Sequence, residues 1–466
     1  MNTNQWLLAA LGAALVGGCA GPLDHRWDDP VYRSLQDRYG ELDRDIAHAP
    51  DQEHSLPAFG LESLDVLSVE DAVRIAIGNS PRLRAAGYQI DAASGRVLQA
   101  GLYPNPSLNF EGEALGSDDG EWGETAYVIE QEIVLGGKLD RARDVAESDR
   151  SAARARFIAE EFAIASSVTR AYFAGVSAQQ RLVMREELAG LALQLLDAAT
   201  ARVEAGSATK PDQLRAEVVY EQAMIELDAA RLDANATMRA LGLVIGSDGS
   251  IKLDLVSSAD RLPILASLES LQSAAIKANS RVSLARIAIE RARRSHQLAK
   301  SQSMPNLVAS IGPRYSDIDH ESTVDVGLGI EIPIFDRNQG EIRATLAERL
   351  SASADLKNVQ VELLAEVSHA WSAYQSAHSA SIRYQNQLLP KAELTLDLTR
   401  QAYKSGKADY LRLLDAQQVV IESRIAYINT LEHLHNASVL LNELTQTHAP
   451  WRNARQDDHP QAEANQ

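Results

Sequence analysis

The stretch of sequence that decides the fold spans residues 138–204 and reads KLDRARDVAESDRSAARARFIAEEFAIASSVTRAYFAGVSAQQRLVMREELAGLALQLLDAATARVE. It contains no proline and only two glycines, Gly175 and Gly190, and its apolar residues recur largely at helical spacing. One helix over this stretch would be about 100 Å long. Because such a helix cannot fold alone, its alanine-rich stripes predict side-by-side packing as antiparallel coiled coils.

The chain is internally duplicated, because residues 69–246 are matched by residues 268–445. Chance similarity between helices would not place the same turn residues at matched points of both halves. The long stretch recurs as residues 340–405, where Pro390 stands opposite Gly190, so a weak point is expected in both long helices. The matched residues are Asn79-Ser80 with Asn279-Ser280, Pro104-Asn105 with Pro305-Asn306, Gly206 with Gly406, and Leu214-Arg215-Ala216 with Leu414-Asp415-Ala416.

Each half is predicted to be a helix–hairpin–helix unit. A first helix begins near Ser68, which can cap it, and each long helix reverses into a shorter one at residues 206–211 or 406–409. The predicted segments are a signal peptide (1–18), an extended leader (19–64), a first repeat (65–246), a linker (247–267), a second repeat (268–446) and a flexible tail (447–466).

Two segments, residues 105–134 and 305–333, alternate apolar and polar residues and predict β-hairpins. Each strand is about ten residues long, which is the length of a tilted strand that crosses a bilayer. A soluble hairpin with one solvated face is the alternative. Four strands cannot close a barrel in a membrane, so a membrane hairpin pair requires sister chains, and three copies would supply twelve strands.

The composition limits the possible functions. A formal net charge of -19 and a pI near 5.1 argue against nucleic-acid binding, because phosphate contacts need clustered Lys and Arg. No arrangement of residues indicates a catalytic site, a metal site or a cofactor, and the sequence is not that of an enzyme. His433 and His435, which are separated by one residue, are interpreted as surface features.

The only cysteine, Cys19, follows a short apolar run that ends in Val16-Gly17-Gly18. The run is too short to span a bilayer and resembles a bacterial lipoprotein signal, in which the cysteine thiol accepts the lipid. Residues 1–6 depart from that pattern because they contain no Lys or Arg. A buried free cysteine is the alternative interpretation.

Three segments around the hairpins carry a resemblance to a known family. Residues 103–108 read YPNPSL, residues 131–138 read QEIVLGGK and residues 332–340 read IPIFDRNQG. With the duplication, they resemble the TolC-type outer-membrane efflux family over roughly residues 65–446, and most closely the outer-membrane component of heavy-metal efflux systems. Gly136-Gly137 and residues 336–340 must turn the chain from strand to helix, where glycine relaxes the backbone and Asp or Asn caps the helix.

The resemblance implies a mainly α protein with a membrane β-barrel part: a homotrimer whose 12-stranded outer-membrane barrel continues into a long α-helical periplasmic tunnel. It also implies a passive exit duct in the outer membrane of a Gram-negative bacterium, in contact with lipid. A periplasmic adaptor and an inner-membrane proton-driven pump of the resistance-nodulation-division type would select the cargo and supply energy. Heavy-metal cations are the expected cargo. Drugs or other small molecules, or a non-channel periplasmic coiled-coil scaffold, remain open.

The resemblance also places a gate at the helical tips. Tyr403 and Asp415 stand at the family's positions for a latch tyrosine and a pore-facing aspartate, and Asp212 at that for a latch acid. This sequence departs from the best-studied channel type at Arg412, which replaces a second pore-facing aspartate, and at Ala408, which replaces a latch arginine.

The closing network must therefore differ from the family pattern. Our hypothesis is that Asp212, Tyr403 and Asp415 pair at the closed tip together with Arg412 and Arg215. The alternative is that these are solvated charges near a helix turn.

The hairpins would line the barrel lumen with acidic residues. Such a lining favours cations by raising their local concentration, although any water-filled pore can have one. The expected lumen residues are Glu111, Glu113, Glu130, Glu132, Asp325 and Glu331.

Overall fold

The structure is a computed structural model that describes residues 66–113, 123–247, 254–255, 266–316, 320–405, 407–408 and 410–447. All of these residues belong to one compact unit, His54–Gln466. The predicted signal peptide, Cys19, the leader up to residue 64 and the tail beyond residue 447 lie outside the described residues.

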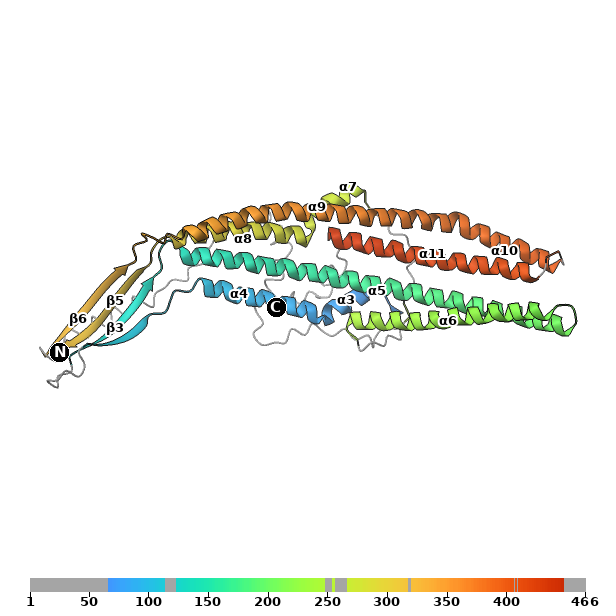
Figure 1. Ribbon diagram of the computed structural model, residues 1–466, viewed down its shortest axis with the longest axis horizontal. Helices are drawn as coiled ribbons and strands as arrows, with labels where there is room; N and C mark the ends of the chain where they lie inside the picture. Colours follow the sequence, from blue (N-terminus) through green and yellow to red (C-terminus); the bar gives the residue numbers. More distant parts are fainter. Residues whose placement is uncertain are drawn as a thin grey trace, which may run out of the picture. The chain divides into compact units, whose positions relative to one another are not determined.

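The two repeats have the predicted order of helices and strands (Figure 1). The first contains α3 (Val69–Asn79), α4 (Pro81–Ala100), β2 (Ser107–Glu113), β3 (Glu124–Ile133), α5 (Lys138–Glu204) and α6 (Lys210–Ile245). The second contains α7 (Leu268–Ala278), α8 (Ser280–Gln302), β5 (Leu307–Ser316), β6 (Glu321–Ile330), α9 (Gln339–Arg383), η2 (Tyr384–Leu388), α10 (Leu389–Lys404) and α11 (Tyr410–Thr445). The short strands β1 (Val66–Leu67) and β4 (Asp254–Leu255) pair in parallel.

The duplication extends to individual hydrogen bonds at the two helical tips. After α5, the backbone N–H groups of Ser207 and Ala208 donate to the carbonyl of Arg202 at 2.8 and 3.1 Å. After α10, the N–H groups of Lys407 and Ala408 donate to the carbonyl of Ala402 at 2.8 and 3.2 Å. In both cases, backbone N–H groups just beyond the end of the helix donate to a carbonyl of its last turn, which has no partner within the helix.

The predicted start of the helical region is confirmed. The Ser68 side chain accepts a hydrogen bond from the backbone N–H of Asp71 at 3.1 Å, which caps α3. The predicted interruptions at Asn79-Ser80 and Asn279-Ser280 separate α3 from α4 and α7 from α8, and the Ser80 and Asn279 side chains cap the second helix of each pair.

The prediction of a weak point in both long helices is wrong for the first repeat. α5 runs through Gly190 without a break, whereas the second long helix contains the π-helical turn η2 just before Pro390. Proline lacks an N–H and its ring clashes with the preceding turn, so the ladder shifts and the N–H of Leu389 donates to the carbonyl of Tyr384. Glycine keeps its N–H and has no ring, so a packed helix tolerates it.

The helices pack lengthwise against one another. α5 lies against α4, α6, α8 and α11, and α9 lies against α8 and α11 (Figure 1). Arg181 of α5 joins two of these neighbours, because it pairs with Asp233 of α6 at 3.2 Å and with Glu432 of α11 at 2.7 Å. The predicted packing of antiparallel helices is therefore observed within one chain.

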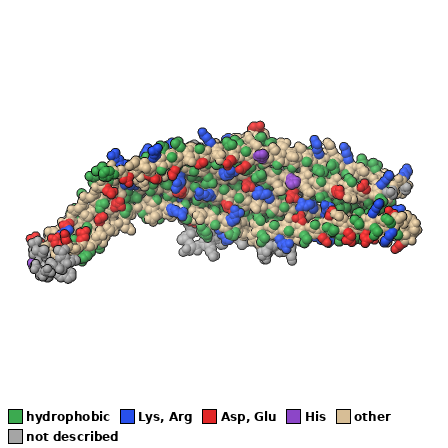
Figure 2. Space-filling view, in the orientation of Figure 1, with side chains coloured by type: hydrophobic (Ala, Val, Ile, Leu, Met, Phe, Trp, Pro, Cys, Tyr) green, Lys and Arg blue, Asp and Glu red, His purple; other side chains and the backbone are tan. Residues whose placement is uncertain are grey.

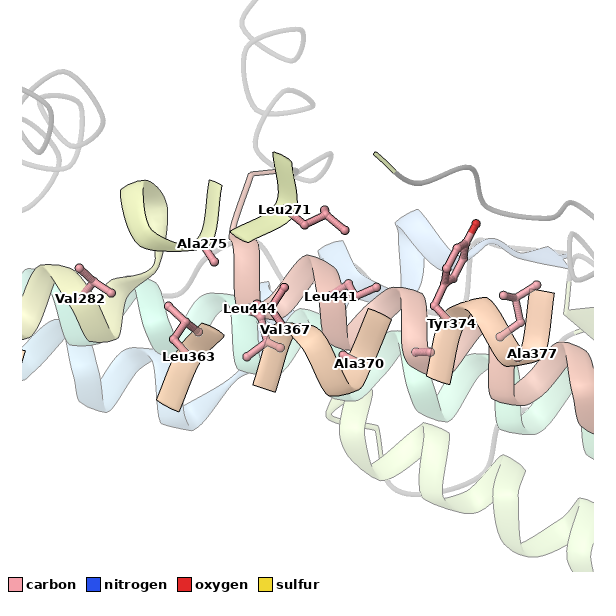
Figure 3. Close-up of a cluster of buried hydrophobic side chains, with 12 residues drawn as sticks. Leu271, Ala275, Val282, Leu363, Val367, Ala370, Tyr374, Ala377, Leu441 and Leu444 are labelled. Atoms are coloured by element: carbon pink, nitrogen blue, oxygen red, sulfur yellow. The ribbon is translucent and has the colours of Figure 1, made fainter. Parts of the chain in front are cut away.

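Apolar side chains from α7, α8, α9 and α11 form a buried cluster (Figure 3). Leu363 and Leu434 are fully buried in it, and Tyr374 is only 4% exposed. In the first repeat, Tyr172 of α5 is fully buried and its hydroxyl donates to the carbonyl of Leu67 at 2.8 Å. These contacts supply the burial that long helices need in order to be stable.

The two predicted hairpins form one antiparallel four-stranded sheet in the order β2-β3-β5-β6. β3 and β5 pair across the two repeats, with Glu130 opposite Ser310. β2 and β6 are the outer strands, and among the described residues each of them has a neighbouring strand on one side only. The sheet that these residues form in a single chain is therefore open at both edges.

Gly312 of β5 is required by a close approach of β3. A Cβ atom added at Gly312 would lie 1.9 Å from the carbonyl oxygen of Tyr127, so one strand would have to move. Gly312→Ala is expected to destabilise the sheet by about 1–3 kcal/mol through overpacking, measured as a lower midpoint of thermal loss of the strand signal in circular dichroism. The matched control is Gly329→Ala on β6, where an added Cβ meets no atom within 4 Å. Equal midpoints for the two variants would contradict this close approach.

Candidate functional site

The strand register sorts the side chains of the sheet onto two chemically different faces. Successive residues of a strand point to opposite faces, and opposed residues of paired strands share one face. The polar face carries Glu111, Glu113, Glu124, Glu130, Glu132, Ser310, Arg314, Thr323 and Asp325. The apolar face carries Leu108, Phe110, Tyr127, Ile129, Ile311, Tyr315, Val324, Val326, Leu328 and Ile330.

The apolar face is exposed in the single chain. Val326 and Leu328 are 72% and 74% exposed, and the Phe110 and Tyr127 rings contact each other with centroids 5.2 Å apart. A contiguous exposed apolar surface of this kind marks contact with a membrane or with another protein. Figure 2 shows acidic side chains over the strands as well, so both kinds of surface lie on the same sheet.

Five of the six acidic residues expected in the lumen lie on the polar face, because the register places Glu111, Glu113, Glu130, Glu132 and Asp325 together. Glu331, the sixth, lies one residue beyond the end of β6.

Glu124 was not among the residues expected in the lumen, although β3 begins at Glu124 and the register places it on the polar face. The signal was present in the sequence, because Glu124 continues the alternation of Glu130 and Glu132.

Arg314 is the cation of the polar face and contacts an acid on each of the other three strands. Its Nε lies 2.6 Å from Asp325 Oδ2 on β6, and its Nη1 lies 3.1 Å from Glu124 Oε2 on β3. Its Nη2 lies 4.0 Å from Glu111 Oε2 on β2. The pairing of Arg314 with these acids was not predicted from the sequence, because only the register between strands brings them together.

Asn306, one of the residues repeated between the halves, joins the strands to the helices. Its side-chain oxygen accepts from Lys138 Nζ and from the backbone N–H of Leu135, the latter at 3.3 Å, and its Nδ2 donates to Glu132. The adjacent Gly136 and Gly137 adopt φ of 76° and 65°, in the left-handed region that favours glycine. The predicted turn from β3 into α5 is therefore confirmed.

The equivalent turn after β6 differs from the expected helix cap. Asn338 adopts φ 58°, and its side chain donates to the carbonyl of Ala299 at 2.8 Å rather than capping α9. Asp336 accepts from the backbone N–H of Asn338 at 2.8 Å. Asn338 therefore anchors the turn to α8, whereas the hydrogen bond to Asp336 lies within the turn.

At the first helical tip, Asp212 is part of a capping box. Its carboxylate accepts from the hydroxyl of Thr209 at 2.6 Å and from the backbone N–H of Thr209 at 3.0 Å. These hydrogen bonds lower the pKa of Asp212, helped by the positive charges of Arg215 and Arg202. Because the folded pKa is depressed, the cap contributes stability above the ordinary aspartate pKa, and that contribution is lost as the pH falls through the folded value.

At the second tip, Tyr403 contacts Tyr410, and their ring centroids are 5.7 Å apart. The pKa of Tyr410 is raised, first by burial and then by the neighbouring Tyr403 and Asp197. Arg412 and Asp415 are exposed near the start of α11.

Within one chain, the described residues Asp212 and Tyr403 are not hydrogen-bonded to each other. Asp212 accepts from Thr209 at the first helical tip, and Tyr403 contacts Tyr410 at the second. Direct pairing of these two residues therefore stays a prediction for a closed assembly.

The interpretation of His433 and His435 as surface features is wrong for His435. His433 is exposed, whereas His435 is 6% exposed and stacks on Phe173 with centroids 4.0 Å apart. Across the described ranges, no group of three or more His, Cys, Asp and Glu residues is arranged to hold a metal ion. None of the helices in those ranges has the length and apolar content to cross a bilayer.

Comparison with known proteins gives consistent matches over both repeats. The family model described as "Outer membrane efflux protein" matches residues 72–247 and 271–446. The cobalt-zinc-cadmium resistance protein CzcC of Cupriavidus metallidurans is 26% identical over 390 residues, covering 84% of this chain and 92% of that protein. The cation efflux system protein CusC of Escherichia coli is 24% identical over 381 residues, covering 76% of this chain and 81% of CusC.

A crystal structure of CusC has a similar fold. It superimposes with a TM-score of 0.68 at 19% sequence identity, covering 85% of this chain and 96% of that chain. The two ranges matched by the family model coincide with the two repeats of helices and strands described above.

Proposed function

The chain belongs to the outer membrane efflux protein family, and we propose that three copies of it form a passive exit duct for heavy-metal cations. The observation that carries the proposal is the two-faced sheet with open edges at β2 and β6. An open strand edge in lipid leaves backbone N–H and C=O groups unpaired, which costs several kcal/mol per group. Pairing β6 of one chain with β2 of the next would remove these edges.

Three chains supply twelve strands, enough to close a barrel, whereas four strands fall below the smallest outer-membrane barrels. In this assembly the apolar face meets lipid and the polar face lines water. That orientation follows from solvation, because acidic side chains are costly on the lipid side. A lipid on Cys19 would add a second membrane attachment, and one acyl-type anchor alone gives weak binding.

The helices of three chains would continue the barrel as a periplasmic tunnel. Its far end is formed by the turns between α5 and α6 and between α10 and α11. Asp212, Tyr403 and Asp415, with Arg412 and Arg215, would form the gate there. A periplasmic adaptor would open the gate, and an inner-membrane pump of the resistance-nodulation-division type would supply energy, since the duct itself carries out no chemistry.

The cargo assignment is supported by two observations. CzcC is named for resistance to cobalt, zinc and cadmium and CusC for cation efflux, and both align with most of this chain. Independently, the polar face bears more carboxylates than cationic groups, which raises the local concentration of cations.

A deletion strain tests the cargo directly. Loss of the gene is expected to lower the tolerated concentration of Co²⁺, Zn²⁺ or Cd²⁺ severalfold, because a cell without the duct retains those ions. Tolerance of dyes and antibiotics is expected to stay unchanged. Growth is measured in graded metal chlorides and in graded drugs, with the intact gene restored on a plasmid as the control. Reduced drug tolerance with normal metal tolerance would assign the duct to small organic molecules instead.

A further inference from the structure

The contact between the two repeats of one chain is a template for the contact between chains. Within the chain, β3 of the first repeat pairs with β5 of the second (Figure 1), and we call this pairing the internal seam. If β6 of one chain pairs with β2 of the next, the second strand of one repeat again meets the first strand of the following repeat. We call that pairing the chain seam. Because the repeats are duplicates, the two seams are two versions of one arrangement.

The strands of the two repeats can be matched residue by residue. The repeated asparagines before β2 and β5 match these two strands, and the register within each hairpin extends the match to β3 and β6. The matched positions are Asn105 with Asn306, Ser107 with Val308, Asn109 with Ser310, Ile129 with Leu328 and Glu130 with Gly329. The sequence agrees independently, because Glu132-Ile133 at the end of β3 recurs at the same spacing as Glu331-Ile332 after β6.

Asn306 bridges the internal seam. Its side chain donates to Glu132 and accepts from Lys138. Glu132 lies at the end of β3 and Lys138 begins α5, so one amide ties the start of β5 to both sides of the turn between β3 and α5. The matched Asn105 is exposed, and no described residue hydrogen-bonds its side chain. The chain seam would give Asn105 the partners that Asn306 has within the chain.

We propose that the chain seam copies the internal seam, so that the Asn105 side chain donates to Glu331 and accepts from Arg337 of the neighbouring chain. The proposal rests on the proposed function, because it names the contact through which the three copies join. Glu331 stands at the position of Glu132, and Arg337 is the one Lys or Arg in residues 331–340, which connect β6 to α9. Glu331 and Arg337 are both exposed in the single chain.

The copy also determines which residues of β6 and β2 lie opposite each other. Copied from the register of β3 with β5, the pairs are Leu328 with Phe110, Gly329 with Asn109 and Glu331 with Ser107 of the next chain. Leu328 and Phe110 both belong to the apolar face, whereas a shift by one residue would set apolar side chains against polar ones. The copy is confined to the strand ends near the helices. Glu111 stands at the position of Gly312 and cannot repeat its close approach to Tyr127.

Disulfide trapping in isolated outer membranes tests this register. Asn109→Cys combined with Gly329→Cys places two thiols opposite each other across the chain seam. Within one chain these positions lie on the two outer strands of the sheet, at least about 14 Å apart, whereas a disulfide needs Cα atoms within about 7 Å. Mild oxidation of the full-length variant is therefore expected to convert most of it into covalent dimers and trimers on a non-reducing gel.

The matched control shifts one thiol by two residues. Asn109→Cys combined with Gly327→Cys keeps both thiols on the polar face but makes them diagonal neighbours, so severalfold less covalent product is expected. Variants with only Asn109→Cys or only Gly329→Cys measure any product that forms through Cys19. As much product from the shifted pair as from the opposed pair would overturn the proposed register.

Alanine variants test the contact itself. Asn105→Ala and Glu331→Ala are each expected to lower the temperature at which the oligomer dissociates, and their combination to lower it no further than the larger single effect, because both remove one contact. Asn109→Ala changes another exposed asparagine of β2 and is expected to have no such effect. Additive losses from Asn105→Ala and Glu331→Ala would overturn the contact.

The same membranes separate a failure of the chain seam from a failure of the proposed duct. Wild-type protein that forms no oligomer would overturn the three-chain duct. An oligomer that forms without a crosslink between Asn109→Cys and Gly329→Cys would overturn the copied seam alone.

Discussion

Val326→Arg is expected to abolish assembly of the protein in the outer membrane. Val326 lies in the middle of β6 on the apolar face, opposite Ile311, and is 72% exposed in the single chain. An arginine at the bilayer midplane costs about 2–4 kcal/mol on the lipid side of a barrel, and three chains repeat that cost. The amount of heat-stable oligomer in isolated outer membranes measures the effect.

The control for Val326→Arg places the same charge on the polar face. Asn109 of β2 lies opposite Val128 on that face and is exposed. Asn109→Arg is expected to assemble at wild-type levels, because its side chain would meet water. Normal assembly of Val326→Arg would show that the apolar face does not meet lipid.

The second large effect is expected at the helical tips, where Asp212→Ala combined with Tyr403→Phe should raise the conductance of reconstituted trimers severalfold. The combination removes a carboxylate and a phenolic hydroxyl, which are the groups that a closed gate would pair. Tyr403→Phe keeps the ring that contacts Tyr410, so the second tip retains its packing. Single-channel recording in planar bilayers compares the variant with wild type.

The capping box of Asp212 requires a further control. Asp212→Ala also removes the hydrogen bonds to Thr209, and loss of this half of the capping box is expected to fray the start of α6. Thr209→Ala removes the side-chain part of the same cap and leaves the carboxylate in place. If Thr209→Ala opens the channel as far as the double variant does, fraying of the helix explains the opening and the gate proposal is wrong.

Most of the fold could be predicted from the sequence because its information is local. The limits of α5 follow from an uninterrupted helical pattern between Gly137 and Gly206, and the tip turns follow from small residues that recur in both repeats. The hairpins follow from period-two alternation, which also assigns each acid to a face. Duplication strengthened each of these predictions, since one physical explanation had to hold in both halves.

The features that could not be predicted depend on how distant segments meet. Arg314 binds acids on three other strands, and nothing local fixes the register that aligns them. The predicted weak point at Gly190 was wrong because glycine keeps the backbone N–H that proline lacks, although Gly190 and Pro390 stand at matched positions of the two repeats. The role of Asp212 could not be read from the sequence either. Its family position suggested a latch, whereas in the structure its carboxylate takes part in the capping box of α6.

In the proposed trimer, sister chains complete an open sheet and enclose a water path. The most direct test is single-channel recording of the purified full-length protein in a planar lipid bilayer. We expect discrete steps of ionic current, each from the insertion of one trimer. Protein that stays monomeric in mild detergent and never carries current would contradict it, and would favour a periplasmic scaffold built from the same helices.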